Sequence, residues 1–132
     1  MLIIAVIEDD ISVLDAVRLV LEFEGWTVRA YGCGEAFLTD LAHYRPDCII
    51  LDPRLPDISG AEIARAVAHE APTPIICLTA YPDSPITKAI EGLGVRVILT
   101  KPVSAKKLVG HVREVLSEGL VASSDTFIET PD

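Results

Sequence analysis

Charged and hydroxyl side chains in this sequence come directly after short apolar runs. Glu8 and Asp9 follow the run "LIIAVI", Asp52 follows "CIIL", Thr79 closes "IICLT", and Lys101 follows "VRVILT". Carboxylates that pack together repel one another, and oxygen ligands without nearby His or Cys suit a hard cation such as Mg²⁺. A hydroxyl and an ammonium group can both hold phosphoryl oxygens. These five residues are therefore the parts that phosphoryl transfer to an aspartate would require.

The apolar runs alternate with helical patterns along the chain. Strands are predicted at residues 2–7, 26–31, 47–51, 75–79 and 95–99, and helices at residues 11–24, 34–44, 61–70, 84–92 and 104–117. This alternation predicts an α/β fold, a doubly wound five-stranded parallel sheet with helices on both faces, although periodicity does not give the strand order. Because such sheets bind ligands beyond the carboxyl ends of their strands, the side chains named above should meet at one edge.

The pattern indicates a single domain followed by a tail. Residues 1–117 contain every predicted helix and strand, and a chain of 132 residues is the usual size of one domain. Residues 118–132 are polar and acidic and show no apolar period. We therefore expect them to be a flexible C-terminal tail or a truncated linker.

The composition limits the possible partners. The net charge is −9, from 11 Lys and Arg against 20 Asp and Glu, so direct nucleic-acid binding is not expected, and cationic partners are favoured. Cys33, Cys48 and Cys77 lack metal-ligand spacing, and the last two lie in apolar runs, which is typical of reduced cysteines in a cytoplasmic protein. The first apolar run lacks the preceding Lys or Arg of a signal peptide, and no apolar stretch reaches the ~18 residues of a membrane span.

Four short motifs together resemble the receiver domains of two-component response regulators, over about residues 2–117. They are "EDD", "LDPRLPDISG", "LTA" and "TKP", each at a predicted strand end. The resemblance implies a flavodoxin-like (βα)5 three-layer sandwich. It also implies a signalling phosphoprotein, which takes a phosphoryl group from a histidine kinase or a phosphotransfer protein and loses it slowly, and which is otherwise not an enzyme. The run "VRAYGCGEAFL" is similar to the branch of the family that often precedes DNA-binding output domains.

The resemblance also implies a role for each site residue. Asp52 would be the phosphoacceptor. Mg²⁺ would be bound directly by Asp9, by Asp52 and by the backbone carbonyl of Arg54. Glu8 would act through a water molecule or through contacts with the direct ligands. Thr79 would bind the phosphoryl group and shift towards it.

Further implications concern Lys101 and the partner surface. Lys101 would pair with a phosphoryl oxygen, and the peptide bond between Lys101 and Pro102 would be cis, a geometry that X–Pro bonds adopt at low cost. Partner contacts, including a possible homodimer, would lie on the fourth helix, the fifth strand and the fifth helix.

Three residues depart from the family pattern. Pro53 replaces a usual aliphatic residue, Ile98 stands where a Phe or Tyr usually swings on activation, and Val103 stands where Phe is common. Because a β-branched side chain cannot swing a ring between two environments, we expect Tyr81 to report phosphorylation instead of Ile98.

Two alternatives compete with this interpretation. One is a pseudo-receiver, an interaction module that works without phosphorylation. Pro53 and Ile98 favour it in part, but the presence of all five site residues argues against it. The other is an aspartate-nucleophile phosphohydrolase. Enzymes of that class use a second Asp two residues after the first, and Arg54 at that position argues strongly against this alternative.

Overall fold

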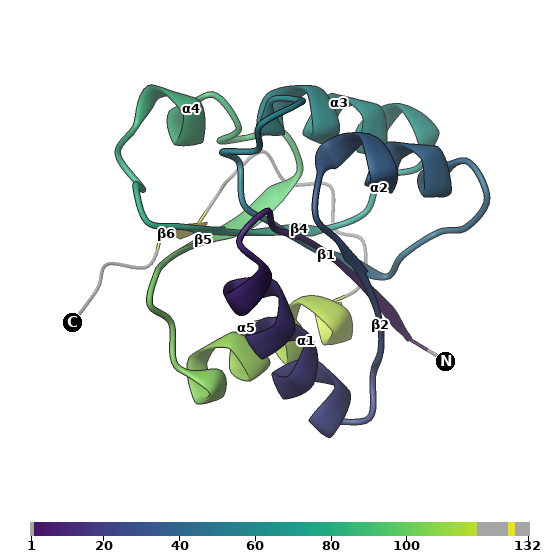
Figure 1. The fold of residues 1–132 in the computed structure, drawn as a ribbon, viewed down its shortest axis with the longest axis vertical. Coiled ribbons are helices and arrows are strands. Elements are labelled where there is room, and N and C mark those ends of the chain that lie inside the picture. The colour runs from purple at the N-terminus through teal and green to yellow at the C-terminus, as the bar shows by residue number, and fades with distance from the viewer. Residues whose placement is uncertain (1, 119–126, 129–132) are drawn as a thin grey trace.

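The computed structural model describes residues 2–118 and 127–128. The strands are β1 (Ile3–Ile7), β2 (Thr27–Tyr31), β3 (Cys48–Leu51), β4 (Ile75–Thr79), β5 (Val95–Thr100) and β6 (Phe127–Ile128). The helices are α1 (Ile11–Phe23), α2 (Gly34–Leu41), α3 (Gly60–Glu70), α4 (Pro85–Lys88) and α5 (Ala105–Glu118). All strands run parallel in one sheet of order β2-β1-β3-β4-β5-β6 (Figure 1). The predicted doubly wound parallel sheet is confirmed.

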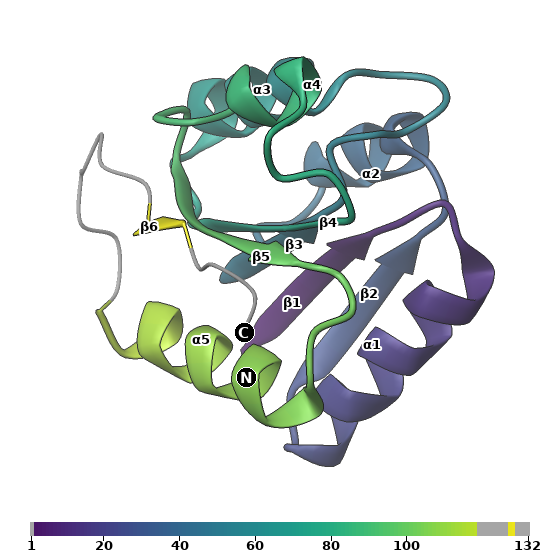
Figure 2. The ribbon, with the colours of Figure 1, turned by 90° about the vertical axis from the view of Figure 1, so that its left-hand side faces the viewer.

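Helices cover both faces of this sheet and give three layers. Figure 2 shows α1 and α5 on one face and α2, α3 and α4 on the other. Alternate residues of β1 to β5 pack into one of two apolar clusters, as strands covered on both faces require. Phe37 and Ile63 lie in the cluster between the sheet and the helices α2 and α3. Leu21 and Val112 lie in the cluster between the sheet and the helices α1 and α5.

Local signals in the sequence explain where helices begin and end. The carboxylate of Asp10 accepts hydrogen bonds from the N–H groups of Ser12 (2.9 Å) and Val13 (3.3 Å), so α1 starts directly after the first strand. Gly25 ends α1 with a φ of 93°, a conformation that glycine adopts without a steric penalty. Asp10 is thus the N-cap of α1.

The structure differs from the prediction in three places. Helix α4 covers only Pro85–Lys88 instead of residues 84–92, and Gly92 and Gly94 have positive φ values in the turns that follow. Helix α2 ends at Leu41 instead of residue 44, and Ala42 and His43 form a turn after it. The other predicted boundaries differ from the observed ones by no more than one residue.

The third difference is β6, which lies in the predicted tail. Phe127 and Ile128 pair with Val97 and Ile98 of β5 and add a two-residue strand to the sheet edge. An edge strand offers unpaired backbone groups, and two residues of high β propensity satisfy part of them. The rest of the predicted tail lies outside the described residues. Among the described helices, none combines the length and the apolar character that a membrane crossing requires.

Candidate functional site

The carboxyl ends of β1 and β3 place two acids side by side. Ile7 pairs with Leu51 in the sheet, so the next residues, Glu8 and Asp52, leave neighbouring strands at the same level. The ladder continues into both acids, because the Asp52 N–H donates to the Ile7 carbonyl (3.0 Å) and the Glu8 N–H donates to the Tyr31 carbonyl (3.0 Å). The backbone of both acids is therefore held by the sheet.

Glu8, Asp9 and Asp52 form a compact acidic cluster. One carboxylate oxygen from each lies within 4.8 Å of the others. Glu8 is 3% exposed and Asp52 is 9% exposed, whereas Asp9 faces solvent. Three carboxylates with no His or Cys among them are a ligand set for a hard divalent cation. The residues present therefore fit Mg²⁺, and Asp9 gives it a path from solvent.

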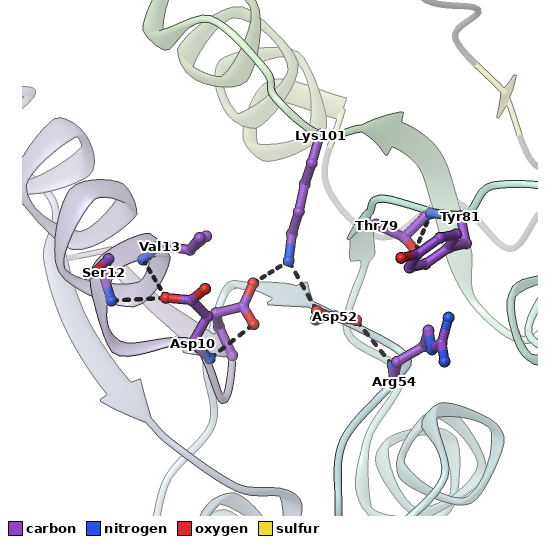
Figure 3. A network of polar contacts seen from close by, with 9 residues as sticks. Asp10, Ser12, Val13, Asp52, Arg54, Thr79, Tyr81 and Lys101 are labelled. Atoms are coloured by element: carbon purple, nitrogen blue, oxygen red, sulfur yellow. Dashed lines mark hydrogen bonds and ion pairs between the residues drawn. The ribbon is translucent and has the colours of Figure 1, made fainter.

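Lys101 supplies the positive charge next to this cluster. Figure 3 shows its side chain reaching down from the end of β5 to Asp52, and its Nζ lies 2.9 Å from the Asp52 Oδ2. The same ammonium group donates to the Glu8 carboxylate. The bond between Lys101 and Pro102 is cis, as the resemblance implies.

Burial and pairing shift the pKa values of Glu8 and Lys101. Burial raises the pKa of Glu8 from its ordinary 4.5 to about 6, although the hydrogen bond from Lys101 acts in the opposite direction. Burial alone would lower the pKa of Lys101, but its hydrogen bonds to Glu8 and Asp52 outweigh this and raise it. The lysine therefore stays charged, while Glu8 takes up a proton more readily than a solvent-exposed glutamate.

The loops after β3 and β4 meet on the other side of Asp52 (Figure 3). The Arg54 N–H donates to the Asp52 Oδ1 (2.9 Å), and the Tyr81 N–H donates to the Oγ1 of the fully buried Thr79 (3.0 Å). The guanidinium of Arg54 lies over the Tyr81 ring, 4.5 Å from its centroid. Each of these loops is thus bonded to one predicted site side chain, and the two loops contact one another.

Sequence reasoning missed the contacts that hold the β3–α3 loop in place. The Asp57 carboxylate accepts hydrogen bonds from the N–H groups of Gly34 (3.1 Å) and Glu35 (2.8 Å) in the first turn of α2. The hydrogen bonds from Glu35 and Gly34 lower the pKa of Asp57 below its ordinary value. The feature that could have predicted this contact is the N-terminus of α2. Cys33 provides no side-chain cap there, so the N–H groups of the first turn need another acceptor.

Pro53 fits this loop because Gly60 has no side chain. A Cβ at residue 60 would lie 2.8 Å from the Pro53 Cβ and 2.9 Å from its Cα, closer than carbon atoms pack. The Gly60 N–H also donates to the Pro53 carbonyl (3.3 Å). Pro53, which departs from the family pattern, therefore fits here because the first residue of α3 is a glycine.

Gly60→Ala is expected to lower the free energy of unfolding by about 2 kcal/mol, since the new methyl group must push Pro53 away from its present position. Gly110→Ala is the matched control, because a Cβ there would meet nothing within 4 Å. It should raise stability by up to ~1 kcal/mol, as alanine is the better helix former. Urea unfolding of both variants measures the two changes, and a Gly60→Ala protein as stable as wild type would contradict the expected clash.

The other two residues that depart from the family pattern lie in the core. Ile98 is fully buried between the sheet and the helices α2 to α4, and Val103 packs partly buried against the cluster under α1 and α5. The ring nearest to Thr79 along the chain is that of Tyr81, whose side chain is 56% exposed.

A parallel α/β sheet with acids, a threonine and a lysine at its carboxyl edge defines a class of signalling domain, the receivers of two-component systems. The family model described as "Response regulator receiver domain" matches residues 4–113, and the chain belongs to this family. The resemblance inferred from the four motifs is confirmed. Receiver domains of response regulators take phosphoryl groups from histidine kinases.

Named relatives and solved structures agree with this family. The chain is 31% identical to the DNA-binding response regulator MtrA of Mycobacterium tuberculosis (strain H37Rv), over 97% of this chain and 59% of that protein. It is 37% identical to the transcriptional regulatory protein AfsQ1 of Streptomyces coelicolor, over 91% of this chain and 53% of that protein. The CheY-like receiver domain from Methanospirillum hungatei JF-1 superposes with a TM-score of 0.83 at 25% identity, covering 89% of this chain and 95% of that one. The chain thus spans just over half the length of these two regulators.

Proposed function

We propose that this chain is the phosphoacceptor receiver domain of a two-component response regulator. In this proposal, Asp52 takes a phosphoryl group from a histidine kinase or a phosphotransfer protein in the cytoplasm, with Mg²⁺, and the modification changes partner binding. Residues 1–117 form the receiver domain. The observation that carries the proposal is the position of Asp52, which lies at the end of a buried strand with the Lys101 ammonium 2.9 Å from its Oδ2.

The chemistry follows from the groups around Asp52. A carboxylate oxygen of Asp52 attacks the phosphorus, the bond from phosphorus to the donor nitrogen breaks, and the imidazole leaves. Lys101 neutralises charge on the phosphoryl oxygens, and the Thr79 hydroxyl donates to one of them. Glu8, Asp9, Asp52 and the Arg54 carbonyl would hold Mg²⁺, which would supply further neutralisation of the phosphoryl charge. We expect hydrolysis of the product to be slow, as the resemblance to the receiver family implies.

Lys101 has two partners before the phosphoryl group arrives. Its Nζ bridges Glu8 and Asp52, so both buried carboxylates have a cation beside them. When Asp52 is phosphorylated, the lysine exchanges the Asp52 oxygen for a phosphoryl oxygen and keeps its charge paired. In this proposal, Mg²⁺ and the Lys101 ammonium group thus bind the same acidic residues.

The signal leaves the site through the loop after β4. The hydroxyl of Thr79 accepts from the Tyr81 N–H, so a shift of Thr79 towards a phosphoryl oxygen breaks or stretches that bond. The Tyr81 carbonyl in turn accepts from the hydroxyl of the fully buried Thr87 (2.8 Å), in the first turn of α4. Tyr81 therefore connects Thr79 to α4, whereas the fully buried Ile98 has no space in which to swing.

Tyr81→Ala keeps the backbone bonds to Thr79 and Thr87 but removes the ring that Arg54 stacks on. It is expected to reduce the phosphorylation-dependent gain in partner binding or dimerisation about tenfold, the usual size of such couplings. Ile98→Val, which keeps the buried apolar volume nearly unchanged, should behave as wild type. Tyr81→Phe is the second control, because it preserves the ring under Arg54. Titration of phosphorylated and unphosphorylated protein measures the gain. If only the Ile98 variant loses it, Tyr81 is not the reporter.

The surface of α4, β5 and α5 is our proposed site for partner contacts and for a homodimer. Because β6 pairs with Val97 and Ile98 of β5, a partner that approaches this edge must either contact β6 or displace it. Direct nucleic-acid binding by this domain is not proposed, since its net charge is −9.

Incubation with acetyl phosphate and Mg²⁺, followed by intact mass measurement, tests the proposed function. A receiver gains the mass of one phosphoryl group. A pseudo-receiver gains none, and that result would favour the alternative in which this domain only binds partners.

A further inference from the structure

The hydroxyl of Thr100 is a buried polar group that has no hydrogen-bond partner in the described part of the chain. The Thr100 side chain as a whole is half-buried, but solvent does not reach its Oγ1. A buried hydroxyl normally has a partner, because an unpaired one loses the hydrogen bonds that water would give it. An unpaired hydroxyl beside a site that changes state is therefore a group that can gain a partner in the other state.

The sheet holds Thr100 beside Thr79. The two residues pair in the register of β4 and β5, and the Lys101 N–H donates to the Thr79 carbonyl (2.8 Å). Cys77 and Ile98, two residues earlier, pair in the same way, and both lie in the cluster between the sheet and the helices α2 and α3. Because side chains alternate along a strand, Thr79 and Thr100 project from this same face of the sheet.

Thr79 lies between Thr100 and the proposed phosphorylation site. Strand β4 is flanked by β3 and β5, so Asp52 is on one side of Thr79 and Thr100 is on the other. The Thr79 Oγ1 accepts from the Tyr81 N–H (3.0 Å). A shift of this oxygen towards a phosphoryl group on Asp52 moves it away from Thr100 and leaves the Tyr81 N–H without its acceptor. Unless another acceptor replaces it, the cost of the lost bond opposes the shift.

We propose that Thr100 is a positioning residue for this shift: when Thr79 turns towards the phosphoryl group, the Thr100 hydroxyl accepts from the Tyr81 N–H in its place. This inference rests on the proposed phosphorylation of Asp52. A threonine hydroxyl moves by rotation about one side-chain bond, so the backbone of β5 does not have to shift. Ile98, the preceding residue on the same face, has no polar side-chain atom, so Thr100 is the side-chain acceptor that β5 offers here.

The exchange of acceptors gives the movement of Tyr81 a direction. Its N–H follows the new acceptor, so the backbone of Tyr81 is drawn away from Asp52 and towards β5. The Tyr81 carbonyl accepts from the Thr87 hydroxyl (2.8 Å), so the movement reaches the first turn of α4. After the exchange, the Thr100 hydroxyl is paired, and the Tyr81 N–H has kept one acceptor throughout.

The amide exchange rate of Tyr81, measured by NMR with and without beryllofluoride and Mg²⁺, tests this inference. Beryllofluoride mimics a phosphoryl group on an aspartate. In the wild-type chain, the Tyr81 N–H should stay protected in both conditions, because one acceptor replaces the other. In Thr100→Val it should exchange about tenfold faster with beryllofluoride and unchanged without it, as expected for the loss of one hydrogen bond.

The stability of Thr100→Val should change in opposite directions in the two states. Without beryllofluoride its melting temperature should rise by about 3 °C, because the variant removes an unpaired buried hydroxyl and keeps the branched shape of the side chain. Its affinity for beryllofluoride should fall about fivefold. A general loss of folding cannot produce both changes. Thr100→Ser keeps the hydroxyl and should restore both the protection of the Tyr81 N–H and the affinity.

Thr73→Val is the matched control, because Thr73 is buried near the start of β4, at the opposite end of the sheet. Its hydroxyl already donates to the Ala71 carbonyl (3.1 Å). This variant should melt below wild type and leave the exchange of the Tyr81 N–H unchanged.

Three results would each overturn the role of Thr100 while the proposed function stands. They are a Tyr81 N–H that exchanges in Thr100→Val as in wild type with beryllofluoride, a Thr100→Ser variant that does not restore protection, and a Thr100→Val variant that does not melt above wild type. A wild-type chain whose spectrum does not respond to beryllofluoride and Mg²⁺ would overturn the proposed function, and this inference with it.

Discussion

Asp52→Asn is expected to abolish phosphorylation, so that acetyl phosphate and Mg²⁺ add one phosphoryl group to the wild-type chain and none to the variant. The amide has nearly the shape of the carboxylate but lacks the anionic oxygen that attacks phosphorus. Asp9→Ala should also prevent labelling, because it removes the exposed carboxylate of the acidic cluster. Excess EDTA should have the same effect on the wild-type chain. Intact mass spectrometry measures all three.

Asp57→Asn is the matched control for this series. Asp57 lies on the same loop as Asp52, but its carboxylate caps α2 and is not part of the acidic cluster. An asparagine oxygen can still accept one of those two hydrogen bonds, and the acidic cluster is unchanged, so this variant should be labelled as fully as wild type. A fully labelled Asp52→Asn protein would show that the phosphoryl group goes elsewhere.

Glu8→Gln is expected to stabilise the metal-free fold at neutral pH. Burial raises the pKa of Glu8 from 4.5 to about 6, so the folded state holds the proton more tightly than the unfolded state. The stability that this protonation contributes is complete below about pH 4.5 and is lost as the pH rises through about 6. The difference corresponds to about 2 kcal/mol at pH 7.5. Glutamine is permanently uncharged, so the variant avoids that loss.

Urea unfolding of wild type and Glu8→Gln in EDTA, at several values from pH 4.5 to 8, measures this difference. The two stability curves should separate progressively between pH 4.5 and 7, with the variant above wild type. Glu22→Gln serves as the control, because Glu22 is exposed and should not separate the curves in this way. A variant less stable than wild type at pH 7.5 would mean that the ion pair with Lys101 outweighs the burial of Glu8.

The sequence predicts most of the fold because most strands are mainly apolar runs bounded by a polar or turn residue, although β2 carries Arg29. Parallel register then brings Glu8, Asp52, Thr79 and Lys101 to one edge, so their proximity could be predicted without knowing the strand order. The length of α4 could not be predicted, because the helical signal at residues 84–92 competes with Gly92 and Gly94. The β6 pairing could not be predicted either, because two residues show no period.

Contacts between loops were the least predictable part of the site. The stacking of Arg54 on Tyr81 joins residues from two different strand ends, and it depends on the conformations of both loops. The same is true of the Asp57 cap on α2, which crosses 22 and 23 residues of sequence. No local pattern encodes either contact. The roles assigned to Asp52, Thr79, Lys101 and the metal ligands stay predictions until the variants are measured.

The Asp57 cap makes the two sides of the site mechanically unequal. The β3–α3 loop is fastened at one end by Gly60 to Pro53 and in its middle by Asp57 to α2, so its shape is set before any ligand arrives. The β4–α4 loop leads into a helix of only four residues, and turns follow it. We therefore expect movement at the site to fall mainly on the β4–α4 loop, which leads into the shorter helix. The direction in which this domain responds would then follow from the difference between its two loops.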